Sequence, residues 1–400
     1  MTRFAAARRR HVRLIALLRS SALALAFLLA AALAASAQQG TDALEGRLRA
    51  KLDSLHSAGR FPGMSVGVAL PDGRALGVTV GMADTTTRVP LRPADRMLAG
   101  STGKTFFAAL ALQLVTEGRL GLDDPISKHL GREPWFPRLP NANAITVRML
   151  MNHTSGLVRY EFREEFARDL TANPYKVWKP EEQLAYILDL EPPFAAGQGW
   201  EYSDTNYIVL AMILERVAGA RAYDEIRRRL LGPLELRGIV PQDGPWIPGL
   251  AQGYAGPSNP FGGRNAMLEN GRLIINPQFE WGGGGFATTA TDLARWAKLL
   301  HENRAYDARL NEQVYSGIPA RGLGQGARYG LGVIILETPL GASYGHSGFF
   351  PGYLTEMRYY PQHRIAVAMQ VNTSTGRPFP RPQGAIMQEL AELIVSEINK

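Results

Sequence analysis

The sequence contains no cysteine among its 400 residues. Without thiols the chain can form no disulfide, offers no cysteine for lipidation and has no thiolate nucleophile. It also lacks a His-Glu-x-x-His motif, so the common zinc-ligand patterns are missing. These absences exclude thiol catalysis, and we expect neither a metal nor any other cofactor.

Nucleotide-binding and nucleic-acid-binding features are missing as well. Gly103-Lys104-Thr105 is similar to the end of a phosphate-binding loop, but that motif requires glycine at position 98, which is Leu98. No basic stripe with interleaved aromatic residues runs along the chain, so nucleic acid is not an expected partner.

The chain also has no apolar run of membrane-spanning length. After Arg19 the apolar run is about 15 residues, whereas a transmembrane helix needs roughly 20. Arginines before Ala22, an apolar stretch to Ala35 and the small-x-small triplet Ala35-Ser36-Ala37 are typical of a secretory signal peptide. We therefore expect cleavage after Ala37, periplasmic or secreted localisation and no membrane span afterwards. Arg8 to Arg10 leave the twin-arginine route open beside the general secretory route.

The net positive charge is small outside this leader. The full chain carries a net charge of +8, and residues 1–37 hold six arginines and no acidic residue, so the mature chain carries +2. Lysine is rarer than arginine: the 44 basic residues include only seven lysines, and only Lys104 has a serine three positions before it. The Ser101 and Lys104 pair is therefore unique in the chain.

Hydrophobic periodicity predicts an α+β fold. Leu44, Leu48, Leu52 and Leu55 form the apolar stripe of a helix over 42–58. Alternating apolar residues predict strands over 64–70, 75–80, 329–336, 342–346, 353–360 and 365–371, and a closing helix is predicted over 383–399. Because strands occur at both ends and the middle is mostly helical, we predict one antiparallel sheet built from both chain ends and flanked by helices.

The mature chain reads as a single domain over 38–400. A sheet subdomain, residues 38–100 and 322–400, would enclose a helical subdomain over 101–321. We find no internal repeat and no linker that would divide the chain further. The polar segments described next would lie at the seam between the two subdomains.

Ser101 and Lys104 begin a stretch that predicts an amphipathic helix, with Phe106, Leu110 and Leu114 on one face. Residues three apart project from the same face of a helical turn. A neighbouring amine can take the proton of a serine hydroxyl if burial lowers the pKa of that amine. Arginine cannot do so, because its guanidinium stays protonated. The pair therefore predicts a nucleophile and its base.

Two further segments carry candidate site residues. Tyr202-Ser203-Asp204 precedes an apolar helix, and a tyrosine beside a cationic lysine is expected to have a lowered pKa, which suits proton transfer. His346-Ser347-Gly348 lies at the end of a predicted strand whose edge could bind an extended substrate. The backbone amides of Phe349 and Ser101 could together form an oxyanion hole, with Gly348 permitting the close approach.

The order of these segments resembles the penicillin-binding, serine beta-lactamase-like group that contains class C beta-lactamases, D,D-carboxypeptidases and family VIII esterases. Residues 150–157 resemble the His-Thr-Ser-Gly-Leu loop of that group, and residues 282–293 resemble its glycine-rich lead-in to a late helix. The resemblance covers nearly all of residues 42–400. It implies a beta-lactamase/transpeptidase-like fold.

By this resemblance Ser101 is the acylated nucleophile, Lys104 its activating amine and Tyr202 the general base and acid. His346 would stand on the strand that binds the carboxylate end of the substrate. His153, in the His-Thr-Ser-Gly-Leu loop, is assigned a structural role.

Two positions depart from the pattern of the group. An amide side chain usually occupies position 204, whereas Asp204 can accept a hydrogen bond from Lys104 but cannot donate one to a substrate carbonyl. Many beta-lactamases carry lysine where this chain has His346, which would be only partly charged at neutral pH. Phe349 and Phe350 indicate an apolar wall. We predict substrate contacts from Asp204, His346, Gly348 and Phe349.

The implied activity is serine hydrolysis through an acyl-enzyme. D-amino-acid peptides of the cell wall are the first candidate substrates, small esters the second and beta-lactams the third, since all present a carbonyl to the same serine. Peptidoglycan is thus one candidate partner, beside a small molecule or peptide substrate. The sequence does not indicate an oligomeric state.

Two alternatives remain open. A catalytically slow penicillin-binding or penicillin-sensing module is favoured by Asp204 and opposed by the intact Ser101, Lys104 and Tyr202. An α/β hydrolase needs Gly-x-Ser-x-Gly, and the two nearest segments, residues 99–103 and 345–349, each lack one glycine.

Overall fold

The computed structural model describes residues 40–400, apart from 258, 260, 262 and 377. The predicted signal peptide lies outside the described residues, so cleavage and export stay predictions. Within the described part of the chain, no helix is long and apolar enough to cross a membrane.

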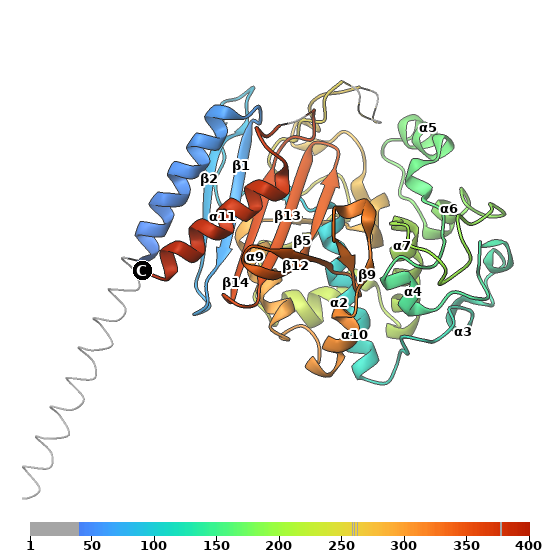
Figure 1. The fold of residues 1–400 in the computed structure, drawn as a ribbon. Helices are drawn as coiled ribbons and strands as arrows, with labels where there is room; N and C mark the ends of the chain where they lie inside the picture. Colours follow the sequence, from blue (N-terminus) through green and yellow to red (C-terminus); the bar gives the residue numbers. More distant parts are fainter. Residues whose placement is uncertain (1–39, 258, 260, 262, 377) are drawn as a thin grey trace, which may run out of the picture.

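A nine-stranded antiparallel sheet forms the centre of the molecule (Figure 1). The two chain ends meet within it, because β1 pairs with β14 through partners such as Val66 and Met369. The sheet confirms the predicted α+β fold. In spatial order its strands are β3 (Val89–Pro90), β2 (Ala75–Asp84), β1 (Gly63–Ala69), β14 (Ile365–Val371), β13 (Tyr353–Tyr360), β12 (Gly341–Phe350), β11 (Ile334–Thr338), β10 (Arg328–Tyr329) and β9 (Ile318–Pro319).

Three strands differ from the prediction, and the strand expected over 75–80 continues to Asp84. The strand expected over 329–336 is divided, because Leu331 and Gly332 donate their backbone hydrogen bonds to the helical region instead of to the sheet. β12 is longer than expected and runs to Phe350, so His346 lies inside a strand rather than at its end. β11 pairs with β12 only as far as Gly345, whereas β13 pairs along it to Phe350. From His346 onward, one edge of β12 therefore has no partner strand among the described residues.

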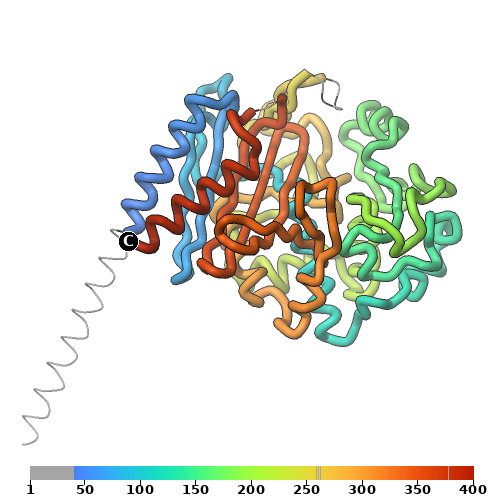
Figure 2. Tube along the Cα trace, in the orientation of Figure 1, coloured from blue at the N-terminus to red at the C-terminus, as the bar shows by residue number. Residues whose placement is uncertain are grey.

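Two helices cover one face of the sheet, as Figures 1 and 2 show. The first spans residues 40–58 and the second is α11 (Gln383–Ile398). The predicted leucine stripe of the first helix is fully buried and packs with residues of β1, β14 and α11 in one apolar cluster. Lys51 and Glu389 link the two helices with an ion pair of 2.6 Å. The first and last helices thus close one side of the sheet.

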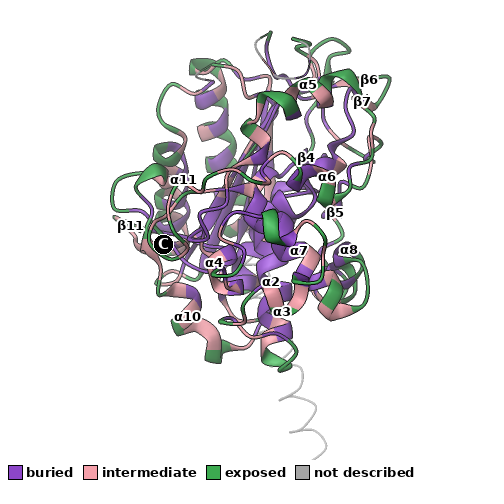
Figure 3. Ribbon diagram, turned by 90° about the vertical axis from the view of Figure 1, so that its right-hand side faces the viewer, coloured by how far each residue is buried: buried purple, intermediate pink, exposed green. Residues whose placement is uncertain are grey.

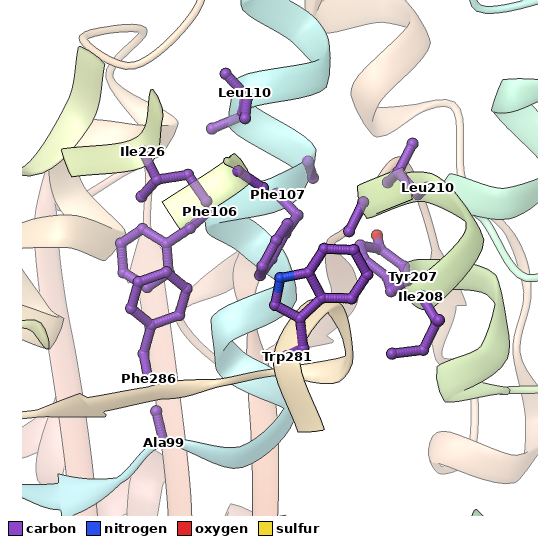
Figure 4. Close-up of a cluster of buried hydrophobic side chains, with 14 of the residues drawn as sticks. Ala99, Phe106, Phe107, Leu110, Tyr207, Ile208, Leu210, Ile226, Trp281 and Phe286 are labelled. Atoms are coloured by element: carbon purple, nitrogen blue, oxygen red, sulfur yellow. The ribbon is translucent and has the colours of Figure 1, made fainter. Parts of the chain in front are cut away.

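The opposite face packs against α9 (Ala290–His301) and, beyond it, α2 (Lys104–Thr116). Gly67 permits this contact, since a Cβ there would overlap the backbone of Ala290. Phe106 of α2 stacks on Trp296 of α9 at 4.3 Å and lies 4.6 Å from Phe286, part of the core in Figure 4. The helix that carries Lys104 is therefore anchored in the main core.

The helical region fills the rest of the molecule around α2 and α7, two largely buried helices (Figure 3). Its helices are α3 (Ser127–Leu130), α4 (Val147–Met151), α5 (Glu164–Ala172), α6 (Pro180–Leu184), α7 (Asp204–Ala218), α8 (Ala222–Ile226) and α10 (Asn311–Tyr315). Small sheets add β4 (Met97–Leu98), β8 (Phe286–Thr288) and β5 (Val240–Pro241), and β6 (Leu268–Glu269) with β7 (Arg272–Leu273).

We expect Leu48→Ala to lower the free energy of unfolding by about 2–5 kcal/mol, because it removes a fully buried side chain from the outer layer. Gly46→Ala is the matched control on the same helix: its new Cβ would touch nothing, and alanine favours a helix by about 0.5–1 kcal/mol. Urea unfolding of both variants checks this. Equal unfolding free energies for Leu48→Ala and wild type would contradict the assigned packing.

Candidate active site

Ser101 and Lys104 are brought together at the start of α2. Ser101 lies in a 3₁₀ turn over Gly100–Gly103, and Lys104 is the first residue of the α-helix. The Lys104 Nζ donates a hydrogen bond to the Ser101 Oγ at 3.0 Å. Ser101 is partly exposed, whereas Lys104 is completely buried. The structure thus places an accessible hydroxyl beside a buried amine.

Glycines let β12 lie against this turn. Gly100 has φ of 51°, and a Cβ there would come within 2.6 Å of the backbone nitrogen of Phe349. A Cβ at Gly348 would overlap the carbonyl oxygen of Ala99 and come within 3.2 Å of the Ser101 nitrogen. The backbones around Ser101 and Phe349 are therefore adjacent, as a pair of oxyanion-binding amides requires.

The ammonium group of Lys104 has three hydrogen-bond acceptors. Besides Ser101, they are the Asp204 Oδ1 at 2.6 Å and the carbonyl oxygen of Gly283. Because an ammonium has three N–H donors, this set satisfies it fully. Burial by itself lowers the pKa of Lys104, but Asp204 and Tyr202 raise it above its ordinary value. Paired with the anionic Asp204, Lys104 is expected to hold its proton more firmly, and Asp204 and Tyr202 together outweigh burial here.

Tyr202 lies over the Lys104 amine, whose Nζ is 5.0 Å from the centre of the ring. Its hydroxyl is buried without a hydrogen bond of good geometry to any described residue. Burial raises the pKa of Tyr202, Lys104 and Ser101 lower it, and the net shift is upward. The expected net lowering by Lys104 was therefore wrong, because burial of the ring is the larger effect.

His153 supports the loop that carries Tyr202. Its ring centre lies 4.2 Å from that of Tyr202, and its Nδ1 accepts a hydrogen bond of 3.3 Å from the backbone nitrogen of Ser203. Burial lowers the pKa of His153 well below its ordinary value. A neutral imidazole that holds backbone fits the structural role expected for it.

His346 is buried on β12 and forms a 2.9 Å hydrogen bond with the hydroxyl of Tyr329 through its Nε2. Burial, helped by the nearby Lys104, lowers the pKa of His346 to about 3. The ring is therefore neutral at physiological pH. The sequence predicted a partly charged histidine that binds a carboxylate, and the charge part of this prediction was wrong.

The two phenylalanines after Gly348 differ in exposure. Phe349 is 58% exposed, whereas Phe350 is buried, with its ring centre 6.1 Å from that of Phe279. Successive side chains of a strand point to opposite faces, which explains the difference. The predicted apolar wall is thus reduced to Phe349, and Phe350 belongs to the core.

Two groups near Lys104, the Gly283 carbonyl and the Glu280 carboxyl group, were not predicted from the sequence. Gly283, whose carbonyl accepts from the ammonium, follows Trp281, which has φ of 32°. Glu280 is buried, accepts a 2.5 Å hydrogen bond from Gln242, and has its pKa raised to about 8 by burial and Asp204. The run of four glycines after Trp281 was the signal in the sequence for this close approach, but only the fold shows that the run lies against Lys104.

Two cavities flank the site. One of about 540 Å³ lies beside Tyr202 and is also lined by Arg159, Trp200, Arg321 and Leu323. The other, of about 280 Å³, lies beside Phe349. Within the described part of the chain, no group of three or more His, Asp or Glu side chains could hold a metal ion.

The chain belongs to the beta-lactamase family, whose sequence model matches residues 35–391. This confirms the family resemblance seen in the motifs. Among solved structures, the D-amino acid amidase from Ochrobactrum anthropi SV3 complexed with L-phenylalanine has a TM-score of 0.73 at 22% identity, covering 90% of this chain and 99% of that one. A D-stereospecific amidohydrolase from Streptomyces sp. has a TM-score of 0.70 at 25% identity, covering 80% and 93%.

Relatives in sequence carry similar names. Penicillin-binding protein 4* of Bacillus subtilis (strain 168) is 26% identical over 294 residues, which cover 71% of this chain and 62% of the relative. A D-aminopeptidase of Brucella anthropi is 26% identical over 322 residues, covering 79% and 57%. A teichoic acid D-alanine hydrolase of Staphylococcus aureus is 25% identical over 280 residues, covering 70% and 63%. The matches thus span less than two thirds of these relatives.

We expect Glu280→Gln to become more stable relative to wild type as pH rises from 5 to 9. In the folded protein the pKa of Glu280 is about 8, against an ordinary value of 4.5, so the unfolded chain releases this proton first and wild type loses stability over that interval. Glutamine cannot ionise. Thermal unfolding midpoints across this pH range, with the exposed Glu337→Gln as control, check the prediction, and a constant difference between Glu280→Gln and wild type would contradict it.

Proposed function

We propose that this protein is an exported serine hydrolase that forms an acyl-enzyme on Ser101, with D-amino-acid peptides, amides or esters as substrates. The observation that carries the proposal is the hydrogen bond between Ser101 and the buried, fully hydrogen-bonded Lys104. The Tyr202 ring lies 5.0 Å from the Lys104 Nζ, and the unpaired edge of β12 lies beside the turn that carries Ser101. D-amino-acid derivatives are supported by the names of the relatives, which include a D-aminopeptidase and a D-alanine hydrolase.

The reaction starts from a resting state in which Lys104 and Tyr202 hold their protons. One proton must leave this pair before Ser101 can lose its own, because both pKa values are raised. Ser101 Oγ then attacks the substrate carbonyl carbon, and its proton passes to the Lys104 and Tyr202 pair. The amides of Ser101 and Phe349 would bind the carbonyl oxygen as it becomes negative. We therefore expect the rate to rise toward alkaline pH.

Collapse of the tetrahedral intermediate breaks the bond to the leaving group, which receives the proton from Tyr202. Water then attacks the acyl-enzyme, gives its proton to the same pair and releases the acid. Ser101 regains its hydrogen. Each proton transfer therefore uses Ser101, Lys104 or Tyr202.

An ester substrate is the second candidate, and Asp204 is the observation that favours it. Its Oδ1 accepts from Lys104, and a carboxylate has no donor for the carbonyl of an N-acylated peptide. An ester of a free D-amino acid does not need that donor. Beta-lactams, which carry such an acylamide, rank third.

Acylation of Ser101 is tested by incubating the mature protein with a fluorescent penicillin and, separately, with a p-nitrophenyl ester. We expect an intact-mass increase in wild type and in the Ser316→Ala control, an exposed serine, but none in Ser101→Ala. Labelling that persists in Ser101→Ala would overturn the assigned nucleophile. Ester turnover without a penicillin adduct would move esterase to first place.

Asp204→Asn should raise the rate of penicillin acylation by about tenfold at pH 7, because one unit of pKa changes the neutral fraction of Lys104 tenfold. The new amide also supplies the missing donor. Labelling rates from pH 6 to 10 should shift toward lower pH in this variant, with the exposed Asp123→Asn as control. An unchanged or slower rate would show that Asp204 does not restrain Lys104.

A further inference from the structure

We propose that a cavity separate from the candidate active site binds a neutral sugar unit of an oligosaccharide. The cavity has a volume of about 430 Å³, within the range of small-ligand sites. It lies between the turn that joins β2 to β3, the segment over 249–252 and the β6–β7 hairpin, which is at the periphery of the molecule in Figure 3. Ser101, Lys104 and Tyr202 do not line it, and it shares no lining residue with the two cavities beside the active site. The inference therefore goes beyond the proposed hydrolysis and does not depend on it.

Hydrogen bonds between distant segments hold the walls of this cavity. Gln252 accepts from the backbone nitrogen of Leu268 at 2.7 Å and donates to its carbonyl oxygen at 2.9 Å, which fixes the β6–β7 hairpin to the 249–252 segment. The hydroxyl of Tyr254 accepts from the backbone nitrogen of Thr85 at 2.8 Å and so fixes the β2–β3 turn to the chain just after that segment. Because these walls are already held in place, binding a ligand costs little in ordering them.

An exposed tryptophan stands at the rim of this cavity. Trp246 is 63% exposed, and a Cβ on the lining residue Gly271 would come within 3.7 Å of a carbon of its indole ring. The indole has no ring contact, cation contact or hydrogen bond with any residue that the structure describes. Tyr175, another exposed aromatic residue, differs because the guanidinium of Arg272 lies over its ring at 3.5 Å. Trp246 therefore offers an unoccupied, flat, apolar surface beside the cavity.

Hydrogen-bonding side chains line the cavity as well. They include Asp84, Thr87 and Asn270. A sugar ring has an apolar face of C–H groups and a rim of hydroxyl groups. The face can pack on an indole, and the hydroxyls need carboxylate, hydroxyl or amide partners when they leave water. One aromatic surface next to several polar side chains therefore fits a sugar better than a wholly apolar ligand.

The charges of the lining favour a neutral ligand. Arg92 offers no free positive charge, because it forms an ion pair of 3.0 Å with the buried Asp95. Asp84 forms no ion pair with any described residue. Burial raises the pKa of Asp84, but hydrogen bonds from Thr87 and Thr86 outweigh it, and the net shift is downward. The carboxylate is therefore ionised at neutral pH, and it would repel a phosphate or carboxylate on the ligand.

Calorimetric titration of the mature protein at pH 6 with four tetrasaccharides tests the proposal. N-acetylglucosamine tetramer and cellotetraose are neutral, glucosamine tetramer is cationic, and tetragalacturonate is anionic. We expect the neutral tetrasaccharides to bind with millimolar or tighter affinity and tetragalacturonate to bind about tenfold more weakly, because it meets the Asp84 carboxylate. Asp84→Asn should narrow this difference, since asparagine keeps the acceptor for the Thr86 nitrogen and removes the charge.

Trp246→Ala should weaken binding of the neutral tetrasaccharides about tenfold, the size of one aromatic contact, and Trp246→Phe should restore part of the loss. Asn270→Gly should weaken binding about fivefold, because glycine tolerates the φ of 52° at this position but lacks the amide. Phe162→Ala, which removes a 70% exposed aromatic side chain outside the cavity lining, is the matched control and should bind as wild type does. Thermal unfolding midpoints check that each variant is folded.

Ser101→Ala should bind the neutral tetrasaccharides with wild-type affinity, which separates this site from the hydrolase assignment. Three results would overturn the proposal: no binding of either neutral tetrasaccharide at millimolar concentration, equal binding by Trp246→Ala and wild type, or tighter binding of glucosamine tetramer than of both neutral ones. Loss of binding in Ser101→Ala would overturn it too, because the sugar would then occupy the active site. Failure of Ser101 acylation would contradict the proposed function and leave this site unaffected.

Discussion

The buried ammonium of Lys104 is the constraint on which the rest of the site depends. Removing a charged amine from water costs several kcal/mol unless its donors are satisfied. The fold supplies three acceptors, from the nucleophile turn, the start of α7 and the glycine-rich segment before β8. Because each comes from a different part of the chain, the ammonium ties these parts together.

The backbone next to this ammonium has unusual φ angles. The carbonyl of Gly283, which accepts from Lys104, lies between two unusual backbone conformations: Trp281 has φ of 32° and Gly284 has φ of 156°. A Cβ at Gly103 would overlap the carbonyl of Gly284, so the two segments can lie this close only with glycine at position 103. Such strain persists where the surrounding structure compensates for it. Here the aromatic core around α2 holds both segments in place.

Much of the fold follows from local patterns. The leucine stripe of the first helix, and the strands over 353–360 and 365–371, were predicted with their observed positions, because one buried face imposes a regular spacing. The break between β10 and β11 was not predictable, since it depends on hydrogen bonds to the helical region. β12 was predicted too short although its pairing with β13 is local: the two strands form a hairpin in which Phe350 pairs with Tyr353 across Pro351 and Gly352.

The sequence by itself determined the chemistry that is available: a single serine placed three residues before a lysine, a tyrosine before an apolar helix, and a glycine after His346. Residue type and spacing carry that information. Only the tertiary structure decided the charge states, because a pKa depends on burial and on neighbours far away in the chain. Asp204 and Tyr202 keep Lys104 protonated, and burial keeps His346 neutral.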